Sequence, residues 1–97
     1  VAPGWIASSG MDTYGGMVRG LIPKLKNHVP LRRLGVEAEV SAAIAFLLSP
    51  AAAFISGVTL QIDGAASLGN TMFPSLDHDK SKPFDGFHRA VTPEVLK

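Results

Sequence analysis

The sequence has no cysteine among its 97 residues. That absence excludes disulfide bridges, thiolate nucleophiles, zinc fingers and iron–sulfur ligation. Histidine is scarce, and the three copies are scattered at His28, His78 and His88. None of them has a partner at a spacing typical of metal ligands, so the sequence predicts no metal site.

The sequence also lacks an uninterrupted hydrophobic run long enough to cross a membrane. The longest apolar stretch, residues 40–58, is broken by serine, proline and glycine. The chain begins at Val1 without a basic, signal-like leader, which we interpret as a sign that it is a piece of something longer. We expect a cytoplasmic protein that does not associate with membranes.

Charged residues make up only 18% of the chain, and the formal net charge is +1. Five of the nine basic residues nevertheless lie between positions 13 and 36, with no acidic residue among them: Arg19, Lys24, Lys26, Arg32 and Arg33. Such a segment either binds phosphate, on a nucleic acid, a cofactor or a thioester tail, or forms a solvated helix face and loop. Aromatic residues are not interleaved with these charges, so we expect no nucleic-acid partner.

The best helical pattern in the chain covers residues 36–49. Glu37 and Glu39 lie in its first turn, where they favour the positive end of the helix dipole, and Pro50 ends it. Apolar side chains recur on one face of this helix: Val36, Val40, Ala43, Ile44 and Leu47, with Phe46 and Leu48 widening the face. This spacing predicts that one face of the helix packs against a core.

Residues 58–62 form the single convincing strand pattern, with alternating apolar side chains. A second strand is expected to end at Pro3 and Gly4, because proline lacks an N–H and glycine permits a turn. Two such pieces do not make a sheet, and an unpaired buried strand costs on the order of 1–3 kcal/mol for each unmet backbone group. The remaining strands must come from a missing N-terminal segment or from another chain.

Two segments lack a regular pattern. Residues 12–26 have a helical pattern interrupted by glycine and proline, which predicts a weak, mobile pair of helices that is either a lid or a loose edge. Residues 65–97 have no periodicity and predict a tail or wrapping arm, with Phe73, Phe84 and Phe87 as its anchors.

Three segments in order resemble a known family. They read Ala2-Pro3-Gly4-Trp5-Ile6-Ala7-Ser8, then Leu31-Arg32-Arg33-Leu34-Gly35 with the helix that follows, and finally Phe54-Ile55-Ser56-Gly57-Val58-Thr59-Leu60-Gln61-Ile62-Asp63-Gly64. Together they are similar to the C-terminal portion of the short-chain dehydrogenase/reductase superfamily. The resemblance covers about the first two-thirds of the chain.

The resemblance implies an α/β fold, the C-terminal part of a doubly wound, Rossmann-like parallel sheet that is incomplete on its own. Residues 1–65 are then the C-terminal part of that domain, and residues 66–97 are a tail. It also implies an oxidoreductase that transfers hydride between NAD or NADP and an alcohol, carbonyl or enoyl thioester, with a lipophilic substrate expected. Family members often form homo-oligomers through this last helix and strand.

The resemblance also implies site residues. Those matching the family's cofactor turn are Pro3, Gly4, Ile6, Ser8 and Ser9. In the family, the backbone at the position of Ile6 binds the nicotinamide carboxamide. A hydroxyl, here of Ser8 or Ser9, reaches either the carboxamide or the pyrophosphate. Residues 13–27 match the variable substrate lid, and the apolar surface at the lid comes from Trp5, Met11, Met17, Leu21 and Leu25. These side chains either contact a lipophilic substrate or simply pack against one another.

The family's catalytic tyrosine, followed four residues later by a lysine, is missing. The sole tyrosine is Tyr14, and the residue four positions on is Val18. A glycine-rich phosphate loop is missing as well, so we assign no catalytic residue and expect the 97 residues alone to be inactive. The cofactor, NAD or NADP, would be bound mainly by the missing N-terminal part. The alternative is a non-catalytic interaction or oligomerisation module that borrows a partner's sheet through the strand at residues 58–62.

Overall fold

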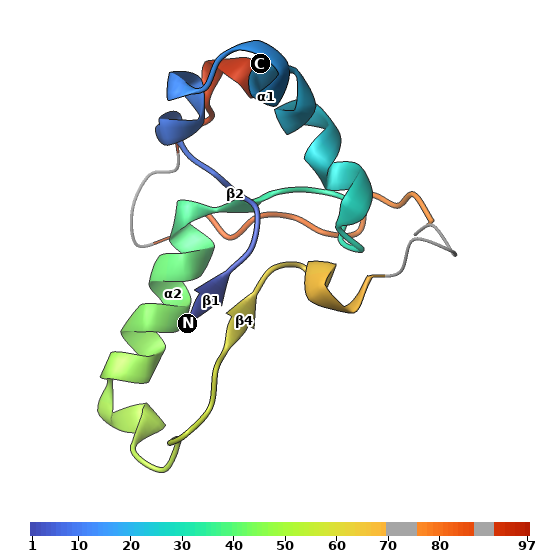
Figure 1. The fold of residues 1–97 in the computed structure, drawn as a ribbon. Coiled ribbons are helices and arrows are strands. Elements are labelled where there is room, and N and C mark those ends of the chain that lie inside the picture. The colour runs from blue at the N-terminus through green and yellow to red at the C-terminus, as the bar shows by residue number, and fades with distance from the viewer. Residues whose placement is uncertain (70–75, 87–90) are drawn as a thin grey trace.

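The computed structural model describes residues 1–69, 76–86 and 91–97 as an α/β arrangement with parallel strands (Figure 1). This confirms the expected fold class, a partial Rossmann-like unit. The strands and α-helices, in chain order, are β1 (Ala2–Pro3), β2 (Ile6–Ala7), α1 (Gly16–Leu21), β3 (Gly35–Val36), α2 (Glu37–Leu48) and β4 (Gln61–Ile62). The 3₁₀ helices are η1 (Ser9–Thr13), η2 (Ile22–His28), η3 (Pro50–Ala52), η4 (Ala66–Leu68) and η5 (Glu94–Leu96).

The first strand pairs in parallel with the last one, which joins the two ends of residues 1–62. The N–H of Ala2 donates to the carbonyl of Leu60 at 2.8 Å, and the N–H of Gly4 donates to the carbonyl of Ile62 at 3.0 Å. Successive residues of a strand direct their backbone groups to opposite sides, so Pro3 faces away from β4. Since proline has no N–H, β1 offers no donor there to a strand on its other side, and it ends as predicted.

The predicted strand at residues 58–62 is wrong in length, because only Gln61–Ile62 is a strand. The partner, β1, is itself two residues long, so Val58 and Thr59 have no strand beside them among the described residues. Val58 and Leu60 are accordingly exposed.

In a second parallel pair, β2 with β3, residues 35–36 lie beside residues 6–7 near the N-terminus. The N–H of Gly35 donates to the carbonyl of Trp5 at 2.9 Å. A methyl group at position 35 would come within 2.7 Å of Cδ1 of Ile6, so glycine permits this close approach.

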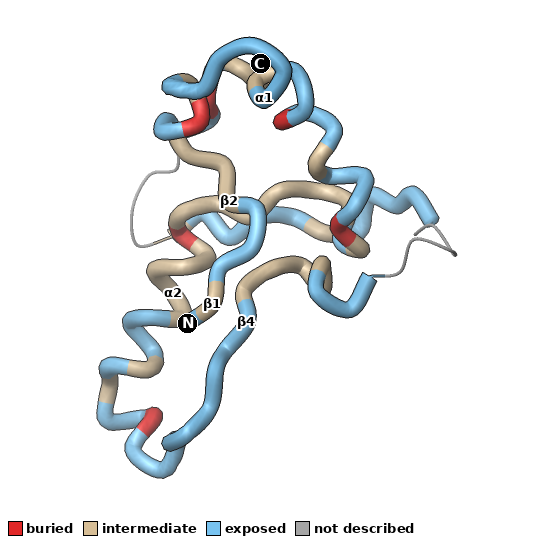
Figure 2. The backbone as a smooth tube through the Cα atoms, viewed as in Figure 1, coloured by how far each residue is buried: buried red, intermediate tan, exposed pale blue. Residues whose placement is uncertain are grey.

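Helix α2 confirms the helix predicted for residues 36–49 to within one residue at each end. The N–H of Val36 donates to Oε2 of Glu39 at 2.9 Å and closes the first turn. At the other end, both the N–H and the hydroxyl of Ser49 donate to the carbonyl of Phe46. The expected core face is only partly covered, because Ile44, Phe46 and Leu48 are exposed and no residue of that face is fully buried (Figure 2). The buried residue of the helix is Ala38, which the pattern did not place on that face.

The interrupted helical pattern over residues 12–26 becomes three short pieces, η1, α1 and η2. Gly16 adopts a left-handed conformation with φ +60° at the start of α1, and Pro23 lies in the first turn of η2. The pattern is thus interrupted as predicted, but into three short pieces and not into the expected pair of helices. Within these pieces only Met11 and Ile22 are buried.

The described tail wraps the core and is attached at several points. Nε of Arg33 donates to Oγ of Ser81 at 2.8 Å, and the carboxylate of Asp77 pairs with Arg32. The N–H of Phe84 donates to Oε1 of Glu39 at 3.2 Å, so this expected anchor is held through its backbone. The other two expected anchors, Phe73 and Phe87, lie outside the described residues.

Within the described ranges, no helix combines the length and hydrophobicity that a membrane span requires.

Candidate functional site

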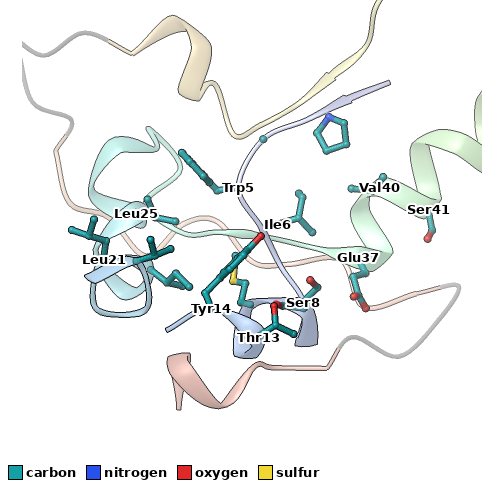
Figure 3. Close-up of a pocket in the computed structure, with 16 residues that line it drawn as sticks. Trp5, Ile6, Ser8, Thr13, Tyr14, Leu21, Leu25, Glu37, Val40 and Ser41 are labelled. Atoms are coloured by element: carbon teal, nitrogen blue, oxygen red, sulfur yellow. The ribbon is translucent and has the colours of Figure 1, made fainter. Parts of the chain in front are cut away.

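A cavity of about 990 Å³ opens between the β1–β2 segment, the lid segment (residues 13–27) and the beginning of α2 (Figure 3). Most of its side chains are apolar or aromatic. It is lined by Pro3, Gly4, Trp5, Ile6, Ser8, Gly10, Met11, Thr13, Tyr14, Val18, Leu21, Ile22, Leu25, Glu37, Val40 and Ser41. Large apolar cavities with a few polar groups are the usual form of small-molecule sites.

Four of the five residues expected at the cofactor turn line this cavity: Pro3, Gly4, Ile6 and Ser8. Ser9 does not line it and is exposed at the start of η1. Of the two neighbouring hydroxyls that the sequence left open, the structure thus brings Ser8 to the cavity.

The backbone of Ile6 suits a ligand with adjacent donor and acceptor groups. The β2–β3 ladder uses the carbonyl of Trp5, which accepts from the N–H of Gly35. Because backbone groups alternate in direction along a strand, the N–H and carbonyl of Ile6 are directed away from β3. Together with the Ser8 hydroxyl on the same cavity, they match the amide edge of a carboxamide, so these residues fit a nicotinamide.

The lid residues divide into two groups. Trp5, Met11, Leu21 and Leu25 line the cavity as expected, whereas Met17 does not and is 83% exposed.

Sequence reasoning missed Tyr14, Val18 and Ile22, which do line the cavity. Part of the signal was present, because positions 14, 18, 21 and 25 follow a 4-3-4 helical spacing. Met17 lies four residues before Leu21 and fits the same spacing, so its exposure does not follow from the pattern.

Polar groups are few in the cavity and no proton-transfer pair is among them. The Thr13 hydroxyl donates to the carbonyl of Gly10 at 2.7 Å, and the Tyr14 side chain extends into the cavity (Figure 3). Val18, four residues after Tyr14, also lines the cavity, and no described lysine does. The described residues can therefore bind an apolar molecule with a polar end, but they do not assemble a tyrosine–lysine pair.

Basic residues of the 13–36 stretch are largely engaged with carboxylates. Arg33 makes two hydrogen bonds to Glu39, at 2.9 and 2.7 Å, and Arg32 pairs with Asp77. Burial acts to raise the pKa of Glu39, but the hydrogen bond from Arg33 and those from backbone N–H groups outweigh it, so this pKa lies below its ordinary 4.5. Three of the five basic residues, Arg19 included, thus have acidic partners and do not form an open phosphate-binding patch.

Comparisons with known proteins agree with this geometry. A family model described as enoyl-(acyl carrier protein) reductase matches residues 1–67. An uncharacterized oxidoreductase of Mycobacterium tuberculosis is 36% identical over 77 residues, which cover 79% of this chain and 27% of that protein. The 3-oxoacyl-[acyl-carrier-protein] reductase MabA of Mycobacterium bovis is 35% identical over 74 residues (72% and 27%), and an acetoacetyl-CoA reductase of an Acinetobacter species is 36% identical over 64 (66% and 25%). The chain spans about a quarter of the length of these relatives.

Proposed function

Because this chain belongs to the short-chain dehydrogenase/reductase superfamily, whose matching members are oxidoreductases, we propose that it forms the C-terminal part of an NAD(P)-dependent oxidoreductase. The proposed substrate is a lipophilic alcohol, carbonyl compound or enoyl thioester. One observation carries the proposal: the cofactor turn and the apolar lid, which are separate in sequence, line one cavity. Two relatives are named as reductases of acyl thioesters, which supports the substrate class.

In this proposal the chain binds and orients and does not itself exchange protons. The backbone of Ile6 and the hydroxyl of Ser8 hold the carboxamide of the nicotinamide, which when bound supplies or accepts the hydride. The apolar side chains of the lid exclude water from the reacting atoms. An absent segment supplies the glycine-rich loop, the tyrosine–lysine pair and the strands beside β1, so the 97-residue chain alone is expected to be inactive.

Ser8→Ala in the full-length enzyme tests the cofactor role. Loss of one hydrogen bond from the Ser8 hydroxyl should weaken NAD(P)H binding roughly two- to tenfold, as measured by titration of cofactor fluorescence. Ser9→Ala is the matched control, because it removes the same hydroxyl one residue away from the cavity. Equal effects of the two substitutions, or no effect of Ser8→Ala, would contradict the assignment.

A second candidate function is an interaction module without catalysis. Exposed apolar side chains before β4, such as Phe54 and Val58, favour a surface that another chain covers. An enzyme subunit that assembles with copies of itself needs such a surface too, so the two functions are distinguished by cofactor binding and not by assembly.

A further inference from the structure

Asp12 links the cavity wall to the far end of the chain. Its Oδ2 accepts the N–H of Glu94 at 3.1 Å, and its Oδ1 accepts the N–H of Val95 at 3.2 Å. These are the first two N–H groups of η5, which have no partner within that helix. Asp12 is therefore the N-terminal cap of a helix some eighty residues away in sequence, and it lies in η1, immediately before the lid segment.

The same helix packs against both η1 and η2 (Figure 1). Pro93, which precedes it, is less than 2% exposed. Met11 and Ile22 line the cavity, yet they are only 8% and 4% exposed, so their remaining surface is covered from behind. Met11 belongs to η1 and Ile22 to η2, the two elements that η5 contacts.

Resting on the proposed function, we propose that residues 93–97 are a strut that sets the shape of the substrate cavity. Asp12 and the two backbone N–H groups fasten the strut to the outer side of the wall, and Met11 and Ile22 transmit its position to the cavity. Asp12 is a positioning residue in this account, because it acts on the substrate through these two side chains.

The tail also has an independent attachment upstream of the strut. Arg33 and Glu39 hold the tail at Ser81 and Phe84, close to the beginning of α2. With one end attached near α2 and the other capped by Asp12, the tail connects two sides of the cavity. A change at the Asp12 end should therefore loosen the lid segment without releasing the whole tail.

Glu94→Pro in the full-length enzyme removes one of the two N–H donors and leaves Asp12 in place. Proline is tolerated at the first helical position, and Pro93 already has the extended conformation (φ −64°, ψ 149°) that a residue before proline requires. Glu94→Ala is the matched control, because it deletes the same side chain and retains the N–H. Removal of residues 93–97 is the stronger variant.

Two measurements test the effect of these variants. Amide hydrogen exchange over residues 9–28 should accelerate about tenfold in Glu94→Pro, and more in the truncated protein, but not in Glu94→Ala. The second measurement is steady-state kinetics with NADPH and NADH supplied. In Glu94→Pro and in the truncated protein, the KM for 3-oxododecanoyl-CoA should rise several-fold relative to the unmodified enzyme. The KM for acetoacetyl-CoA and both kcat values should change less than about twofold. The long acyl chain reaches the wall that the strut supports, and the short one does not.

Unchanged amide hydrogen exchange in both Glu94→Pro and the truncated protein would contradict the proposal that residues 93–97 support the cavity wall. Faster exchange with unaltered KM values would overturn the strut's role in positioning the cavity wall. If the unmodified enzyme reduces neither thioester, the proposed function fails in its substrate class, and the exchange experiment still decides whether the strut exists.

Discussion

At the scale of single residues, Gly4, which follows β1, lies close against Asp63, which follows β4. A methyl group at this position would lie 2.7 Å from Cβ and 3.0 Å from Cα of Asp63. Those atoms belong to backbone and its first side-chain carbon, which have little freedom to move. The carboxylate of Asp63 is itself fixed, because its oxygens accept the N–H groups of Ala65 and Ser67 at 3.0 and 3.2 Å.

Gly4→Ala should therefore push β1 away from β4 and lower the free energy of unfolding of the full-length protein by about 1–3 kcal/mol. Gly20→Ala is the control: it lies inside α1 with open space around it, so it should stabilise the protein by about 0.5–1 kcal/mol. Urea unfolding of both variants checks the pair. Equal stability of Gly4→Ala and the unmodified protein would show that the contact relaxes.

At the scale of elements, α2 is fastened to the tail through one carboxylate. Glu39 accepts from the N–H of Val36 in its own first turn, from Arg33, and from the N–H of Phe84 in the tail. A carboxylate with these donors is stabilised in its ionised form, which is why its pKa is lowered despite the opposing effect of burial.

The lowered pKa of Glu39 predicts a pH-dependent stability. The folded state holds the proton less tightly than the unfolded state, so the stabilisation is fully present above the ordinary pKa of 4.5 and is lost as the pH falls through the lower folded value. Glu39→Gln should destabilise the protein near neutrality, and the difference from the unmodified protein should shrink below about pH 4.5.

Thermal unfolding followed between about pH 3 and 7 measures this difference. Asp79→Asn is the matched control, because it removes an exposed carboxylate of the same tail. A destabilisation by Glu39→Gln that is the same at all pH values would argue against an ionised Glu39 as the cause.

Elements whose ends are determined by neighbouring residues in the sequence could be predicted. Elements whose extent depends on residues distant in the sequence could not. Helix α2 follows from its own acidic first turn and from Pro50. The strand β4 is shorter than its alternating pattern, because its length depends on what β1 offers.

The same distinction holds at the candidate site. The Pro3–Gly4 turn was recognised from its residues, and it does line the cavity. The orientation of Met17 away from the cavity and the capping of η5 by Asp12 depend on tertiary packing, which no local pattern records.

At the scale of the whole molecule, exposed apolar side chains are frequent in one stretch of the described chain. It comprises the C-terminal half of α2 and the chain leading to β4, with Ile44, Phe46, Leu48, Phe54, Val58 and Leu60. Phe54 is fully exposed, at 103% of its reference surface. Exposed apolar side chains in this number favour contact with another protein surface, and we propose that a second copy of the protein covers them.

Phe46→Glu together with Phe54→Glu should dissociate this assembly, because two charges would have to be buried. Loss of one large apolar side chain alone costs about 1.5–3 kcal/mol, so the dissociation constant should rise at least about tenfold. Sedimentation velocity of the full-length protein measures it. Leu76→Glu, at an exposed apolar position on the tail, is the control, and an unchanged mass of the double variant would place the interface elsewhere.

The parallel pairing of β1 with β4 also determines how late in synthesis β1 can pair. Ala2 finds its partner Gln61 only after roughly sixty further residues have been added, which at about 5–20 residues per second takes several seconds. Helix α2 can form from its own residues in far less time. During that interval the backbone of β1 on the side of β4 lacks this partner, so this strand edge is open to other contacts while the chain is being made.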